Sequence, residues 1–437
     1  MQRSYVSFAR PIDPAGRDHS AGPGKLSVAA TVLGNALEFY DFITYAFFAV
    51  MIGQTFFPAA TEVASLLMSV ATFGVGFVMR PVGGLVIGAI GDRFGRKPAM
   101  LLTIALMAIG TLGLAATPSY QAIGIAAPII VVLARLVQGF ALGGEVGPAT
   151  AYLLETAPHT RRGTYASWQI ASQGVAALVA GTIGVTLSSI LSPEDLKSWG
   201  WRVPFLVGLA IVPVGLYIRN RLPETLDRGD GHADRKIFTT LLRDHGWILL
   251  LAVFVIMCGT ISTYVGNYMT TYAMTTLKLP PTTSLSATMI GGMSTAIFAL
   301  VGGRLADRHG RKLLMILPRF LLLVVAYPAF LLILDQKSAI ALFISTAALT
   351  GLTAMSAAAS VILITECLPR ELRSTGLSLV YATGVAVFGG TTQFIVTWLI
   401  NATGDPLSPA YYLIVSSVIG LVAMALMPET RDTKLLP

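Results

Sequence analysis

The sequence predicts an all-α integral membrane protein with twelve transmembrane helices in two pseudo-symmetric six-helix bundles. Of its 437 residues, 54% are hydrophobic and only 12% are charged, whereas about a quarter of the residues of a soluble protein are charged. The apolar residues form long blocks, and three polar motifs occur twice at nearly the same separation. Together these observations exclude an ordinary soluble protein.

Twelve segments are apolar enough to be membrane spans, since a helix needs about 20 residues to cross the hydrocarbon core. They are predicted at residues 27–52, 65–90, 99–117, 121–153, 164–190, 203–218, 246–275, 282–303, 313–334, 339–365, 374–400 and 409–427. The expected organisation is a disordered cytoplasmic tail at 1–24, an N-terminal bundle at 25–221, a cytoplasmic linker at 222–245 and a C-terminal bundle at 246–437.

The basic residues predict how the spans are oriented. With the N-terminus inside, four of the 30 Lys and Arg residues fall in outer loops, three fall within spans, and 23 fall in the tails and cytoplasmic loops. An excess of Lys and Arg on the cytoplasmic side is the usual topological signal. We therefore expect a bacterial inner-membrane protein with both termini in the cytoplasm. The net charge of +8 then reflects topology and not nucleic-acid binding.

Three motifs are duplicated along the chain. The segment Gly91–Lys97 returns at 306–312, with Asp92 matched by Asp307, 215 residues later. Glu155 returns as Glu366 after 211 residues, and 223–225 returns as 428–430 after 205 residues. A parallel repeat of six spans places all three motifs at the same side of the membrane.

These motifs resemble those of the major facilitator superfamily. The loop 91–97 and its repeat are similar to that family's loop between helices 2 and 3, and 135–139 is similar to its helix 4 motif. Segments 35–42, 79–84, 143–145, 161–163 and 167–169 resemble the metabolite:proton symporter branch, which carries citrate, α-ketoglutarate, shikimate and proline or betaine. The resemblance implies a proton-coupled symporter that works by alternating access, and we expect a small organic acid such as citrate or a related di- or tricarboxylate.

The resemblance also implies that the repeated loop latches the two halves together. The residues expected in this latch are Asp92, Arg93, Arg96, Asp307, Arg308 and Arg311. Asp92 is the stronger candidate of the two aspartates. The alternative is a solvated loop that only sets topology.

Six ionisable residues lie inside predicted spans, at a cost of roughly 2.5–3.5 kcal/mol for one at a helix centre. They are Glu38, Asp41, Arg80, Arg135, Glu145 and Arg319. Because no histidine lies well inside a span, the three carboxylates are the candidates for proton coupling, and Arg80 and Arg135 are the candidates for binding an anion. The alternative is an ion-pair network that only holds helices together. Arg319 is expected to extend to the membrane interface, because it lies only ~9 Å along its helix from the cytoplasmic end.

Polar side chains in other spans are candidates for completing a substrate's hydrogen bonds. They are Gln169 and Gln173 in the fifth span, Tyr264, Asn267 and Tyr268 in the seventh, and Tyr381 and Gln393 in the eleventh. Packing between helices uses the same residue types, so a purely structural role stays open for each.

The sequence fits several other functions less well than organic-acid import. Antiporters of the resembled superfamily usually have a Gly-Pro motif in the fifth helix, whereas residues 169–181 contain no proline. A proton symporter for a zwitterionic osmolyte is the serious alternative, although such carriers tend to have a long extension after the last span, and this sequence ends at Pro437. Short loops argue against a receptor. No nucleophile–base pair, metal-ligand spacing or cofactor motif suggests an enzyme, so we expect no metal or cofactor, and we expect a monomer.

Overall fold

The computed structural model describes residues 25–94, 96–143, 153, 157–210, 212–213, 235–369 and 373–430. Every element in these ranges is a helix. The N-terminal half contains α1 (Lys25–Phe47), α2 (Ala49–Phe56), α3 (Glu62–Val78), α4 (Arg80–Phe94), α5 (Arg96–Ala116), α6 (Tyr120–Ile123), α7 (Ala126–Leu142), η1 (His159–Arg161), α9 (Arg162–Ile190), α10 (Pro193–Ser198), η2 (Gly200–Arg202) and α11 (Val203–Gly208). The C-terminal half contains α13 (Arg235–Thr275), α14 (Pro281–His309), α15 (Arg311–Gln336), α16 (Ala339–Glu366), α17 (Arg373–Gly384), the π-helix η3 (Val385–Gly389), α18 (Gly390–Thr403) and α19 (Ser408–Leu426).

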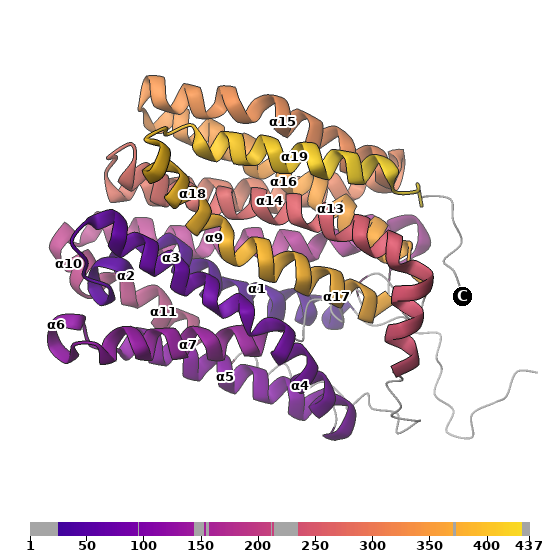
Figure 1. Ribbon diagram of the computed structural model, residues 1–437, viewed down its shortest axis with the longest axis horizontal. Helices are drawn as coiled ribbons and strands as arrows, with labels where there is room; N and C mark the ends of the chain where they lie inside the picture. The colour runs from indigo at the N-terminus through magenta and orange to yellow at the C-terminus, as the bar shows by residue number, and fades with distance from the viewer. Residues whose placement is uncertain are drawn as a thin grey trace, which may run out of the picture.

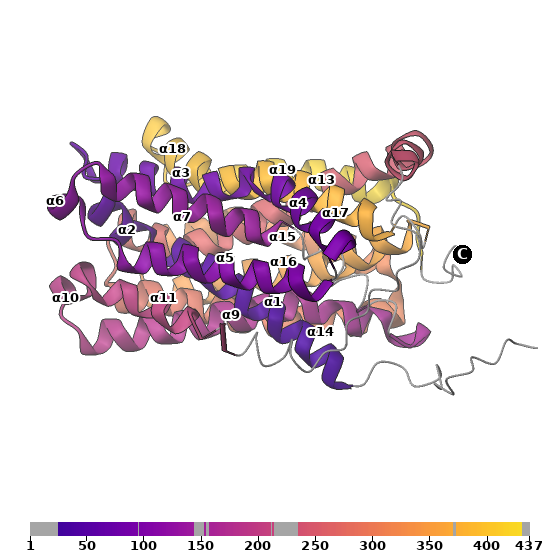
Figure 2. The ribbon, with the colours of Figure 1, turned by 90° about the horizontal axis from the view of Figure 1, so that it is seen from below.

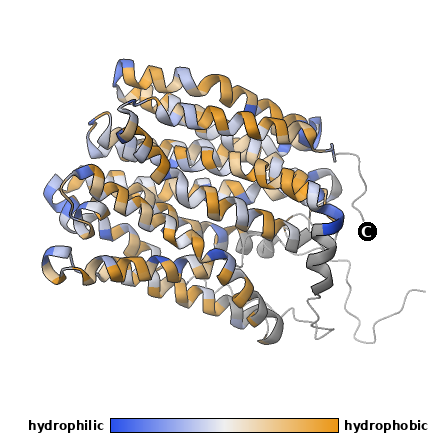
Figure 3. Cartoon of the chain, in the orientation of Figure 1, coloured by the Kyte–Doolittle hydropathy of each residue, from blue (hydrophilic) through white to orange (hydrophobic). Residues whose placement is uncertain are grey.

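The long helices run side by side, with the N-terminal half below the C-terminal half in Figure 1 and short α6 and α10 at one end. Hydrophobic residues cover the middle of the helices and hydrophilic residues gather towards the two ends (Figure 3). We call the end that carries the α14–α15 turn and the C-terminal residues Glu429 and Thr430 the motif end.

The helices reproduce the predicted spans. In the described part, eight helices are long and apolar enough to cross a membrane, and α1 with α2, bent by 65°, forms a ninth. Two shorter apolar helices, Leu101–Ala116 and Ala126–Leu142, match the third and fourth predicted spans. The sixth predicted span is described only at 203–210 and 212–213.

One helix extends beyond its predicted span. Helix α13 begins at Arg235, inside the segment expected to be a linker. Ile237 and Leu241 are four residues apart in this segment, which is the apolar spacing of one face of an amphipathic helix. The linker is therefore partly helical.

The most extensive contacts between the two halves are those of α9 with α14 and of α3 with α18. Small residues line both contacts: a Cβ atom on Gly74 would lie 2.4 Å from the Gly390 carbonyl oxygen, and one on Gly174 would lie 2.4 Å from the Ala296 nitrogen. Glycine allows the backbones of facing membrane helices to approach closely. These contacts place α1, α9, α13, α14 and α16 around a cavity between the two halves.

Candidate functional site

Two buried arginines of the N-terminal half share one aromatic ring. Arg80 begins α4 and Arg135 lies in α7, and their side chains are 6% and 0% exposed. The Arg80 Cζ atom lies 4.6 Å from the centroid of the Phe42 ring, and the Arg135 Cζ atom lies 4.8 Å from it. Guanidinium groups within about 6 Å of a ring centroid are attracted to its electron-rich face.

Three further rings complete an aromatic cage, which consists of Phe42, Tyr45, Phe73 and Phe77. Phe77 lies 4.1 Å from the Arg80 Cζ atom, and Tyr45 lies 4.2 Å from the Arg135 Cζ atom. The rings also pack on one another, with the Phe42 centroid 4.7 Å from Phe73 and 4.8 Å from Phe77. These phenylalanines are not among the residues predicted for the site, although Phe73 and Phe77 are one helical turn apart.

Asp41 is connected to Arg135 through Gln138. The Gln138 side-chain amide donates to Asp41 Oδ2 and to Thr111 Oγ1, and its oxygen accepts from Arg135 Nη1 at 2.6 Å. Asp41 itself is 3% exposed. The positions of the charged residues along their predicted helices allow a direct contact between a carboxylate and an arginine. At Asp41, however, the Gln138 side chain lies between the carboxylate and Arg135.

Several charged atoms of this site have no hydrogen-bond partner among the described residues. They are Asp41 Oδ1, Arg80 Nε, Arg135 Nε and Arg135 Nη2. Within the same ranges, no carboxylate forms an ion pair with either arginine. The guanidinium groups thus keep donors that an anion can use.

Close contact between α3 and α7 positions Arg135. A Cβ atom on Gly139 would lie 1.7 Å from the Gly76 carbonyl oxygen, and one on Gly76 would lie 3.0 Å from the Arg135 carbonyl oxygen. Only glycine fits such a contact without displacing a backbone. The glycine pair therefore holds the backbone of Arg135 against α3.

The predicted polar residues divide into two groups. Tyr264 and Tyr381 lie within electrostatic reach of the Arg80 guanidinium, and Tyr381 faces Gln169 and Gln173. The site therefore brings four other predicted substrate residues together around Arg80.

Tyr268 and Gln393 lie elsewhere. The Tyr268 hydroxyl accepts a 3.0 Å hydrogen bond from Thr397. Gln393 is buried, and its side-chain amide has no hydrogen-bond partner in the described part of the chain. Neither residue lines the cavity described next.

A cavity lies between the two halves. The N-terminal half lines it with Phe39, Ile43, Phe47, Ile170, Gln173, Gly174 and Ala177, and the C-terminal half with Thr263, Tyr264, Gly266, Asn267, Thr288, Gly291, Gly292, Thr295, Thr350, Thr353, Ala354 and Ala357. Tyr264 links this cavity to the arginines, because its ring lies 5.5 Å from that of Phe77. Arg80 and Arg135 do not line the cavity themselves.

Some predicted residues lie outside the described part. Glu38 falls on α1, one turn before Asp41, but its side chain is not described, and Glu145 is outside the described residues altogether. The side chains of Asp92, Arg93 and Arg96 are likewise not described.

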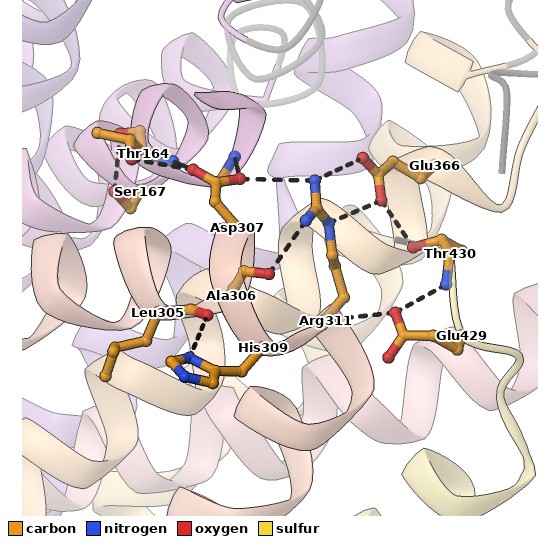
Figure 4. A network of polar contacts seen from close by, with 11 residues as sticks. Thr164, Ser167, Leu305, Ala306, Asp307, His309, Arg311, Glu366, Glu429 and Thr430 are labelled. Carbon is orange, nitrogen blue, oxygen red and sulfur yellow. Dashed lines mark hydrogen bonds and ion pairs between the residues drawn. The ribbon is translucent and has the colours of Figure 1, made fainter. Parts of the chain in front are cut away.

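A second polar cluster at the motif end brings the repeated motifs of the C-terminal half together (Figure 4). Arg311 contacts Asp307 at 3.5 Å and Glu366 at 3.2 Å. Glu366 also accepts from the Thr430 hydroxyl at 2.6 Å. Glu429 accepts from the backbone N–H groups of Arg311 and Lys312, both at 3.0 Å, and so caps the start of α15.

Asp307 is the residue of this cluster that joins the two halves. Its carboxylate accepts from the backbone N–H groups of Gly163 and Thr164, at 2.7 and 2.9 Å, and from the Thr164 hydroxyl. These groups begin α9, where unpaired N–H groups and the helix dipole favour a negative charge. Arg308, in contrast, is exposed and forms no ion pair in the described ranges, so its place in the latch stays a prediction.

The expectation for Arg319 is wrong. Its side chain does not extend to the interface but is 0% exposed. The Arg319 Nη1 atom donates to the Ser262 hydroxyl at 2.6 Å and to the Cys258 carbonyl oxygen at 3.2 Å. Polar groups of α13 replace water as the partners of this arginine.

Comparison with known proteins agrees with this architecture. The model of the Major Facilitator Superfamily matches residues 31–335 and 286–436. The chain belongs to the major facilitator superfamily. Among solved structures, the partially occluded inward-open xylose transporter XylE from E. coli has a TM-score of 0.76 at 18% identity, covering 94% of this chain and 99% of that one. This match shows the shared twelve-helix fold.

Curated relatives are similar over nearly the whole length. The citrate-proton symporter of Klebsiella pneumoniae is 39% identical over 408 residues, which is 92% of each chain. The citrate-proton symporter of Salmonella typhi is 38% identical over 90% of this chain and 92% of its own. The proline/betaine transporter of Salmonella typhimurium is 34% identical over 94% of this chain and 85% of its own.

Proposed function

We propose that this protein is a proton-coupled symporter that imports a small organic acid, citrate or a related di- or tricarboxylate, by alternating access. The observation that carries the proposal is the pair of buried arginines that share the Phe42 ring and have no carboxylate partner among the described residues. Cation–π contacts stabilise each guanidinium by about 0.5–2 kcal/mol, whereas burying an ion costs several kcal/mol. The rings alone do not offset that cost, so the site favours an anion.

The curated relatives support the same substrate class, because the two citrate-proton symporters are 39% and 38% identical to this chain. A zwitterionic osmolyte is the second candidate. The proline/betaine transporters are 34% identical, and Phe39, Phe47 and Tyr264 supply aromatic surface to the cavity, which suits a quaternary ammonium group. No described lining residue carries the negative charge that would complete such a site.

Proton coupling is assigned to Asp41, with Glu38 and Glu145 as further candidates. When Asp41 is ionised, Gln138 donates to it and turns its amide oxygen to Arg135. Protonation of Asp41 weakens this bridge, and Arg135 is then free to face an incoming carboxylate. Proton and anion therefore favour each other's binding.

The contact of Asp307 with the start of α9 is proposed as the latch between the halves. It holds α14 against α9 at the motif end while the opposite side exchanges substrate. We place this end in the cytoplasm, with both termini, in the inner membrane, and we propose that a monomer is the working unit. Labelling of an introduced cysteine at Gly231 by an impermeant reagent in intact cells would contradict this orientation.

An uptake screen in proteoliposomes tests the proposed function. Labelled citrate, other di- and tricarboxylates, proline and betaine are offered with and without an inward proton gradient. The proposal requires accumulation of an acid that depends on the gradient. Accumulation of betaine without accumulation of any acid would replace it with the osmolyte function.

A further inference from the structure

The C-terminal wall of the cavity carries polar groups but no charge among its described residues. Its hydroxyl and amide side chains are those of Thr263, Tyr264, Asn267, Thr288, Thr295, Thr350 and Thr353. Both arginines of the site belong to the other half. The two sides of a bound substrate therefore meet different chemistry.

The hydrogen-bond partners of three threonines define what this wall can accept. Thr263 donates its hydroxyl proton to the Gly259 carbonyl oxygen at 3.0 Å, Thr350 to Thr346 at 2.8 Å, and Thr353 to Leu349 at 2.7 Å. A hydroxyl group has one proton and two lone pairs. Once the proton is used within the helix, the oxygen can only accept a hydrogen bond from the cavity.

Packing holds Thr350 in this orientation. A Cβ atom on Gly266 would lie 2.9 Å from the Thr350 methyl carbon, and one on Gly291 would lie 3.4 Å from it. Glycine at both positions makes room for this methyl group between α13 and α14. Thr353 is 4% exposed and sits one turn further along α16.

On the basis of the proposed function, we infer that Thr350 and Thr353 recognise an O–H donor on the substrate, either the hydroxyl of a hydroxy acid or the proton of an un-ionised carboxyl group. An ionised carboxylate has only lone pairs and finds no donor in these two oxygens. The substrate is thus oriented with a carboxylate towards Arg80 and its O–H group towards α16. This assigns specificity to residues that the arginine site does not include.

The test compares citrate with tricarballylate, which has the same three carboxyl groups and no hydroxyl. Binding of each acid to the purified full-length protein is measured at mildly acidic pH for the parent, for Thr350→Val with Thr353→Val, and for Thr186→Val. Valine keeps the shape of threonine and removes the acceptor. Thr186 is a matched control, because its hydroxyl also donates to a carbonyl of its own helix, that of Thr182, but it is exposed outside the cavity.

An acceptor role predicts about a tenfold loss of affinity in the double variant and none in the control. Loss for citrate alone identifies the hydroxyl as the donor, and loss for both acids identifies a protonated carboxyl group. Unchanged affinity for both acids overturns the inference while leaving the proposed function intact. A parent protein that binds neither citrate nor tricarballylate refutes both the inference and the proposed function. If the double variant does not fold, Thr353→Val alone gives the same comparison with a smaller change.

Discussion

The two halves share a repeated pattern, yet Arg80 and Arg135 of the N-terminal half are held differently from Arg311 of the C-terminal half. In the N-terminal half, Arg80 and Arg135 are buried on aromatic rings and keep unpaired donors. In the C-terminal half, Arg311 is buried at the motif end and its guanidinium contacts two carboxylates. The donors of Arg311 are taken up by the protein, whereas Arg80 and Arg135 keep donors that an anion can use. Arg319 also keeps an unpaired Nε and Nη2 among the described residues, but it does not contact the aromatic cage.

The largest effect is expected from substitution of Asp41, the proposed coupling residue of the N-terminal half. Asp41→Asn removes the titrating group but keeps an oxygen that can accept from Gln138. We expect accumulation driven by a proton gradient to fall to the level of empty liposomes, while exchange of citrate across the membrane continues. Uphill accumulation by Asp41→Asn, and also by Glu38→Gln, would show that coupling resides elsewhere.

Arg80→Lys tests whether the free donors of the N-terminal arginines bind the anion. Lysine keeps the charge but loses the planar fork that pairs with a carboxylate. Affinity for citrate should fall by about 10- to 100-fold, since hydrogen bonds to charged groups contribute about 1.5–3 kcal/mol. Arg135→Lys should have a smaller effect, because Gln138 already occupies one of its nitrogens. Calorimetry with Arg304→Lys, an exposed control, measures the difference, and unchanged affinity in both interior variants would reject the anion site.

Asp307→Ala tests the polar cluster of the C-terminal half, in which Arg311 contacts Asp307 and Glu366. It removes three hydrogen bonds to the start of α9, so the transport rate should change by about threefold to tenfold while citrate affinity stays the same. Arg308→Ala is the matched control at the next position, and its side chain is exposed. Equal effects of the two variants, or a loss of affinity in Asp307→Ala, would exclude a latch.

The smallest effect is expected at Arg319, the buried arginine of the C-terminal interior. Its contacts are with Ser262 and the Cys258 carbonyl oxygen, away from the cavity-lining residues. Arg319→Met should lower stability by about 1–3 kcal/mol and leave citrate affinity unchanged. Thermal unfolding and calorimetry on the same sample separate the two, and weaker citrate binding would place Arg319 in the substrate site.

The sequence predicts the fold, the repeat and the interior position of Arg80, Arg135 and Asp41, because apolar length and buried charge are local properties of the chain. The aromatic cage and the threonine acceptors are not visible in it. Phe73 and Thr353 resemble ordinary packing residues until facing helices bring them to an arginine or a cavity. Arg319 was misplaced because distance along its own helix says nothing of Ser262 on a neighbouring one.

The C-terminal wall of the cavity also shows why a sequence repeat does not predict a substrate site. In the C-terminal half, where the structure describes them, the duplicated motifs lie at helix ends, and Asp307, Glu366 and Glu429 cap or pair with neighbouring helices there. Residues around the cavity are not part of these motifs, so each half supplies different groups. The proposed substrate site is therefore asymmetric, although the two halves have similar folds.

Coupled movement of proton and acid is tested most directly by following protons during citrate uptake. Proteoliposomes containing the parent protein are given citrate in a weakly buffered medium at a pH where the acid is fully ionised. The external medium should become more alkaline in step with citrate entry, and Asp41→Asn should exchange citrate with no such change. Citrate entry into parent liposomes without proton uptake, or the same proton-to-citrate ratio in Asp41→Asn, would contradict the account.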